Sequence, residues 1–146
     1  MRLLILTACL VGIVTAMAVA QTVPTFDPAR LYLTEAEFNR AIQPYQQAIQ
    51  ADARNARAHY WLGVAYFEGY RQSRSGIAPY AEKYLPRAIT SLTEAIKLDP
   101  GLLNAYVVLI DAHASNGEPD KAEAVKNQLR QRTRPGWLPP GPQIGP

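Results

Sequence analysis

Few residues of this 146-residue chain have the types and spacing that acid–base or metal chemistry requires. An imidazole acts as a general base or a metal ligand, and the chain has two histidines, His59 and His113. Neither stands at metal-ligand spacing from a cysteine or a second histidine, and the carboxylates Glu68, Glu82 and Asp111 form no obvious pair. We therefore expect packed, hydrogen-bonded histidines, and we predict no enzyme, no catalytic residue, no metal site and no cofactor.

The single cysteine, Cys9, lies in a segment with the features of an export signal. Arg2 supplies a charged start, an apolar run follows over residues 3–14, and Ala18-Val19-Ala20 forms a small-x-small cleavage site. We expect cleavage after Ala20 and an exported, periplasmic or extracellular protein without a stable membrane span. Two alternatives stay open: residues 3–20 could remain as an uncleaved anchor, or Cys9 could be lipidated.

The charge of the chain does not favour binding to nucleic acid. The formal net charge is +3, which is too small to indicate a polyanion partner. Basic residues are in local excess only near the end, at Lys126, Arg130, Arg132 and Arg134. Since cations stabilise the C-terminal end of a helix, a solvated helix end explains them better than a polyanion site. We expect no nucleic-acid partner.

Small and apolar residues recur at helical spacing over residues 88–100, where the pattern ends at Asp99-Pro100. One set of equivalent residues elsewhere is 47 residues apart: Ala41 and Ala88, Ala58 and Ala105, Leu62 and Leu109, Ala65 and Ala112. A second set is 34 residues apart: Ala88 and Ala122, Ala95 and Leu129. Every pair of the first set spans residues 70–87, which indicates a 34-residue period with a 13-residue insertion in that window.

A helix-turn-helix unit of 34 residues resembles the tetratricopeptide repeat (TPR). Residues 58–66, Ala-His-Tyr-Trp-Leu-Gly-Val-Ala-Tyr, are similar to the first helix of that repeat, and Ala88, Leu92, Ala95 and Pro100 follow as the second. The resemblance covers about residues 35–132 and implies an all-α fold: a short right-handed solenoid of antiparallel helix pairs, with about two and a half repeats. Gly63 and Ala88 should let the two helices of the complete repeat approach closely.

Start and stop signals divide the chain into elements. Pro24 and Pro28 exclude a regular helix over residues 21–33, so the first repeat lacks its first helix. Thr34 and Glu37 form a capping box for a helix that reaches Asp52, with a kink or a break at Pro44. Further helices are expected over residues 56–70, 87–98, 102–115 and 120–132, with a polar loop and a short helical turn over residues 71–86. The predicted organisation is a signal peptide (1–20), an irregular segment (21–33), a repeat domain (34–133) and an extended, Pro/Gly-rich tail (134–146).

The TPR resemblance implies a protein-protein interaction module, an adaptor or scaffold that binds a peptide or protein partner in its concave groove. First helices line that groove in the family, and the register then gives these partner-binding residues: Arg57, Tyr60, Val64, Phe67, Glu68, Asn104, Val107 and Asp111. Tyr60, Val64 and Phe67 form an apolar stripe suited to a peptide or helix.

The alternative is a structural, self-assembling module, a homo-oligomer whose groove is covered by its own termini. Four residues near the start, Phe26, Leu31, Tyr32 and Leu33, could fold over the stripe, and so could residues 137–140, Trp-Leu-Pro-Pro. The sequence does not decide between these alternatives, and it does not identify the partner.

Overall fold

The computed structural model describes residues 23–136, so the predicted signal peptide and residues 137–146 of the predicted tail lie outside the described part. The described residues form five α-helices and one short 3-10 helix, without a strand among them, which confirms the all-α prediction. The elements are α1 (Glu35–Ala51), α2 (Ala56–Arg74), η1 (Pro79–Tyr84), α3 (Leu85–Leu98), α4 (Leu103–Ser115) and α5 (Pro119–Arg132).

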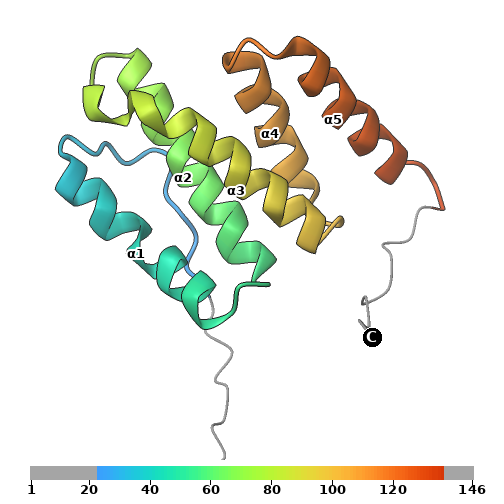
Figure 1. Ribbon diagram of the computed structural model, residues 1–146, viewed down its shortest axis with the longest axis horizontal. Coiled ribbons are helices and arrows are strands. Elements are labelled where there is room, and N and C mark those ends of the chain that lie inside the picture. Colours follow the sequence, from blue (N-terminus) through green and yellow to red (C-terminus); the bar gives the residue numbers. More distant parts are fainter. Residues whose placement is uncertain (1–22, 137–146) are drawn as a thin grey trace, which may run out of the picture.

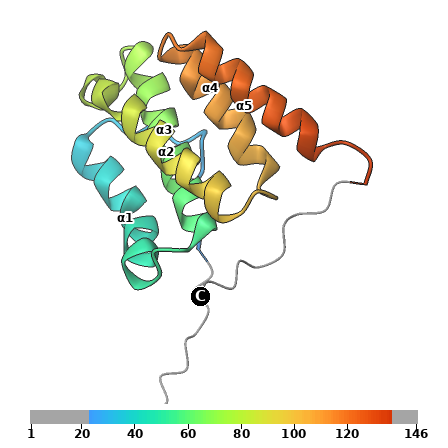
Figure 2. The same ribbon diagram turned by 45° about the vertical axis from the view of Figure 1, so that its right-hand side comes forward.

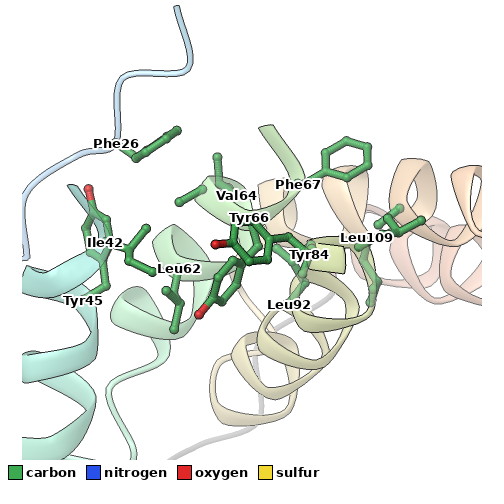
Figure 3. Packing of buried hydrophobic residues seen from close by; sticks show 14 of the residues in the cluster. Phe26, Ile42, Tyr45, Leu62, Val64, Tyr66, Phe67, Tyr84, Leu92 and Leu109 are labelled. Carbon is green, nitrogen blue, oxygen red and sulfur yellow. The ribbon is translucent and has the colours of Figure 1, made fainter. Parts of the chain in front are cut away.

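The helices pack as successive antiparallel neighbours (Figure 1). Helix α3 runs back along α2, and α5 runs back along α4, while α1 lies beside α2 at one end of the array (Figures 1 and 2). One cluster of buried side chains extends from Phe26 across α1, α2 and α3 to Leu109 of α4 (Figure 3). This is the array of helix pairs that the 34-residue period predicts.

Helix α1 begins at the predicted capping box. The Glu37 backbone N–H donates to Thr34 Oγ1 at 3.2 Å, and the Thr34 N–H donates to Glu37 Oε2 at 3.2 Å. The helix continues through Pro44 to Ala51, so of the two predicted alternatives, a kink or a break, the break does not occur. Buried residues on both sides of the exposed proline, among them Ile42 and Tyr45, hold the helix against the core despite the lost backbone hydrogen bond.

The insertion is more helical than the sequence indicates. Residues 71–74, predicted as a loop, extend α2 to Arg74, because Gln72 of that turn is buried and hydrogen-bonded. The predicted helical turn forms as η1, which leads directly into α3 at Leu85. The buried rings of Tyr66 and Tyr84 join α2 to η1, with centroids 5.3 Å apart.

Phe38 of α1 is the centre of a cluster of aromatic rings. Its side chain is fully buried and stacks on Tyr84 of η1 with centroids 4.9 Å apart. Tyr66 of α2 lies 6.0 Å away, Tyr32 lies 5.7 Å away with its ring at 90°, and Tyr80 lies 6.3 Å away. The insertion thus supplies Tyr80 and Tyr84 to the core between α1 and α2.

Residues 23–33, here called the N-terminal strap, contain no helix and lie against both α1 and α2 (Figures 1 and 2). The buried rings of Phe26 and Tyr32 stack on each other at 5.6 Å. Phe26 also meets the edge of Tyr45 at 6.5 Å. The strap therefore fills the place beside α1 and α2 that the first helix of a complete repeat would cover.

Gln72 fastens the strap through its backbone. The Tyr32 N–H donates to Gln72 Oε1 at 3.1 Å, and Gln72 Nε2 donates to the Arg30 carbonyl at 2.9 Å. Tyr80 Oη donates to the Tyr32 carbonyl at 2.8 Å. Two segments that are irregular in sequence, the strap and the insertion, thus satisfy each other's polar groups.

We expect Gln72→Leu to release the strap. The substitution removes two hydrogen bonds and leaves the Tyr32 N–H and the Arg30 carbonyl without these partners, so tryptic cleavage after the exposed Arg30 should accelerate roughly tenfold. Mass spectrometry of a digestion time course measures this rate. The matched control is Gln50→Leu at an exposed position of α1, which should leave the rate unchanged. Equal rates in the two variants would contradict the role of Gln72.

Candidate functional site

A cleft of about 450 Å³ opens at the N-terminal ends of α2 and α4. Val23 and Thr25 of the strap form one edge. The first two turns of α2 contribute Arg57, Tyr60 and Trp61, and residues 101–105 close the other side. The cleft therefore lies where three separate stretches of the chain meet.

The walls of the cleft are mostly apolar. The rings of Tyr60 and Trp61 lie 4.7 Å apart at an angle of 53°, and both side chains are half-buried. Burial raises the pKa of Tyr60 above its ordinary value. Arg57 and Asn104 are exposed and add one cation and one amide. Such a surface can stack on rings or prolines and hydrogen-bond to a peptide backbone.

The structure brings three of the eight predicted binding residues, Arg57, Tyr60 and Asn104, together in this cleft. Val107 and Asp111 are exposed further along α4, and Glu68 pairs with Arg71 at 2.9 Å. The other two belong to the core: Val64 is 7% exposed and Phe67 is 6% exposed, so they offer no open surface, contrary to the groove prediction.

Sequence reasoning missed several lining residues of the cleft. Trp61 was assigned only to the repeat pattern, although it stands next to Tyr60 and is the larger ring. Leu102 and Leu103 follow the Asp99-Pro100 stop, and two leucines directly after a helix stop are the signal that could have identified them.

A family model described as TPR repeat matches residues 30–68. The match begins in the strap and covers α1 and most of α2, including Arg57, Tyr60 and Trp61 of the cleft. The match supports a TPR repeat at residues 30–68. This confirms the family resemblance, and it makes a protein-protein interaction module, rather than an enzyme, the general role that the repeat indicates. A search of curated proteins found no match.

The strap covers part of the face of α2 that the sequence assigns to the predicted groove. Phe26 and Tyr32 are buried as the alternative prediction requires, and Figure 3 shows Phe26 beside the turn of α2 that bears Val64. Leu31 and Leu33 are 56% and 67% exposed, so the prediction that they cover the stripe is wrong. Side chains alternate between the two faces of an extended segment, which places both leucines away from the core that Tyr32 enters.

Both histidines have hydrogen-bond partners, but only His113 is buried as predicted for a core histidine, whereas His59 is partly exposed. His59 Nε2 donates to the Ala53 carbonyl at 3.0 Å and so holds the turn between α1 and α2. His113 is buried, and its Nδ1 donates to Glu118 Oε2 at 2.8 Å. Lys121 binds the other oxygen of Glu118. The imidazoles therefore join turns to helices of the repeats.

Glu118 should make the stability of the chain depend on acid. Hydrogen bonds from Lys121, His113 and Asn116 lower the pKa of this carboxyl from 4.5 to about 2. A lowered pKa stabilises the folded chain above pH 4.5, and this contribution is lost as the pH falls from 4.5 through about 2. Urea midpoints measured across this interval should fall less steeply for Glu118→Gln than for the wild type. The control, Glu82→Gln at an exposed position, should keep the wild-type slope, and a Glu118→Gln curve parallel to the wild type would contradict the assignment.

Lys126 and Arg130 of α5 have an acidic partner on their own helix. Glu123 pairs with Lys126 at 3.2 Å and with Arg130 at 3.4 Å. Arg132 lies over the ring of Tyr106, 5.0 Å from its centroid. These contacts agree with the helix-end interpretation. Across residues 23–136, no three His, Cys, Asp or Glu side chains are grouped so as to hold a metal ion, and no helix there is long and apolar enough to cross a membrane.

Proposed function

We propose that this chain is an exported interaction module that holds a peptide segment of a protein partner in the cleft between α2 and α4. The TPR repeat supports the interaction role, and the features of residues 1–20 support export. The observation that favours this site is the pair of half-buried rings, Tyr60 and Trp61, in an open cleft of about 450 Å³.

The shape of the cleft favours an extended peptide over a bulky domain surface. Its volume suits a few side chains, and its lining combines two aromatic rings with the exposed polar side chains of Arg57 and Asn104. Arg57 and the Asn104 amide can bind backbone carbonyls or a side-chain oxygen of the peptide. Because Val64 and Phe67 are buried, the contact is expected at the N-terminal ends of the two helices, not along the full groove.

Site-specific crosslinking tests this proposal. A photoreactive side chain at the exposed position 104 should capture a discrete partner when the full chain is exported from its own cell. Tyr60→Ala should reduce that product at least about tenfold, since it removes an aromatic anchor. Thr90→Ala, at an exposed position of α3, is the matched control and should leave the product unchanged. A product that persists in Tyr60→Ala would overturn the cleft assignment.

Self-assembly is the second candidate function. The exposed Leu31 and Leu33 of the strap favour it, together with Val107, which is 49% exposed on α4. Light scattering over a range of concentrations separates the two candidates. A monomer at every concentration would exclude self-assembly, whereas a mass that falls on dilution and is lowered by Leu33→Ser would support it.

A further inference from the structure

We infer that the cleft is occupied in the free chain by its own proline-rich tail, residues 137–146, which a partner must displace. This inference rests on the proposed function, because it treats the cleft as a peptide-binding surface. It also specifies the ligand class: an uncharged peptide that presents prolines and a large ring.

The tail begins at the correct end of the molecule. Since α5 runs back along α4, the C-terminal end of α5 lies at the same end of the array as the N-terminal ends of α2 and α4 (Figures 1 and 2). The guanidinium of Arg132, the last residue of α5, lies 5.0 Å from the ring centroid of Tyr106, and the two residues before Tyr106, Asn104 and Ala105, line the cleft.

The tail is also long enough to reach the cleft. Residues 133–136 lead away from α5, and ten more residues follow. A polyproline-type segment rises about 3.1 Å per residue, so ten residues span roughly 31 Å. Packed helices are about 8–10 Å apart. Helix α4 contacts both α5 and α2, so only the end of α4 separates the end of α5 from the cleft (Figures 1 and 2). The tail can therefore span the cleft with residues to spare.

The composition of the tail matches the walls of the cleft. Residues 135–146 contain no charged side chain, and residues 137–142 read Trp-Leu-Pro-Pro-Gly-Pro. Proline-rich segments bind grooves lined by aromatic rings, because their extended conformation is already formed and loses little entropy. The cleft offers the rings of Tyr60 and Trp61 and the aliphatic side chains of Leu102 and Leu103. Its lining contains no carboxylate that would require a basic ligand.

Covalent attachment makes even a weak contact effective. A short tether keeps a segment at an effective concentration in the millimolar range near its site. If the intrinsic dissociation constant of the tail is below this concentration, the tail occupies the cleft in most molecules. A free partner peptide then has to bind the cleft more tightly than the tail does in order to replace it. The tail thus competes with the partner and sets the minimum affinity that a partner peptide needs.

Trp137 can report on its own surroundings. The chain has two tryptophans, and Trp61→Phe leaves Trp137 as the only one while it keeps an aromatic wall in the cleft. In the full-length Trp61→Phe chain, we expect acrylamide to quench Trp137 roughly threefold less than it quenches a synthetic peptide of residues 135–146, because docking shields the indole ring. Emission at a shorter wavelength than that of the peptide should accompany this protection.

Variants of the cleft identify the docking site. In the Trp61→Phe background, Tyr60→Ala should return the quenching of Trp137 to the level of the free peptide. Asn104→Tyr should do the same by filling the cleft from an exposed position, so the test does not depend on a change in the core. Thr90→Ala on α3 should leave the protection intact, and circular dichroism confirms that each variant is folded.

Three outcomes would overturn the inference. The first is quenching of Trp137 as free as that of the peptide, and the second is protection of Trp137 that survives both cleft variants. The third is protection that disappears on dilution, which would place the tail in the cleft of a second copy. If the tail is free while partner crosslinking still depends on Tyr60, the tail inference fails and the proposed function stands. If neither the protection of Trp137 nor the partner crosslinking depends on Tyr60, the tail inference and the proposed function both fail.

Discussion

Replacing Phe38 with alanine should destabilise the folded chain by about 3–5 kcal/mol, the largest effect of any substitution considered for this protein. The Phe38 ring is fully buried and stacks on Tyr84 at 4.9 Å. It also touches the rings of Tyr66 and Tyr32, so one side chain joins α1 to η1, α2 and the strap. Its removal opens a cavity that none of these elements can fill without moving from its other contacts.

Urea denaturation followed by circular dichroism measures the effect of Phe38→Ala. Phe38→Leu keeps most of the buried volume but not the stacking, and should cost about 1–2 kcal/mol. Leu33→Ala is the control, since this side chain is 67% exposed and its loss should change the free energy of unfolding by no more than about 0.5 kcal/mol. Equal costs for Phe38→Ala and Leu33→Ala would show that the aromatic cluster does not stabilise the fold.

The helix pairs could be predicted from sequence because their signals are local. Thr34 and Glu37 are three residues apart and cap each other in the structure. Asp99-Pro100 ends α3 after Leu98, as the loss of a backbone donor and the restriction before proline require. Helices α2 and α3 also approach each other closely at Gly63, as the place of this glycine in the repeat predicts.

The contacts between the strap and the insertion could not be predicted, because they join residues that are far apart in the sequence. Gln72 reads as a loop residue in sequence, yet its amide group binds the backbone of residues 30–32, about forty positions earlier. The helical register likewise identifies the side of α2 on which Val64 lies, but it does not tell whether another segment covers that side. Self-coverage follows from the tertiary fold, and so only part of the predicted groove remains open.

The second large effect is expected at Gly63, where Gly63→Val should destabilise the chain by about 3 kcal/mol. A Cβ atom added at this position would lie 2.6 Å from Leu92 Cγ and 3.1 Å from the Leu92 backbone nitrogen. Leu92 is fully buried between α2 and α3, so its side chain cannot swing into solvent. Helices α2 and α3 would have to separate, and the contacts along their whole interface would weaken.

A double mutant distinguishes this steric cause from a change in helix propensity. Gly63→Val adds three carbon atoms and Leu92→Ala removes three, so the pair conserves the volume of the seam. The double mutant should be more stable than the sum of the single effects by at least about 1 kcal/mol, as measured by urea denaturation. The rescue should be partial, because trimming Leu92 leaves its backbone nitrogen 3.1 Å from the added Cβ. Gly101→Val in the loop before α4 is the control and should show no coupling to Leu92→Ala. Additive costs for Gly63→Val and Leu92→Ala would show that the glycine is not required for the approach of α2 to α3.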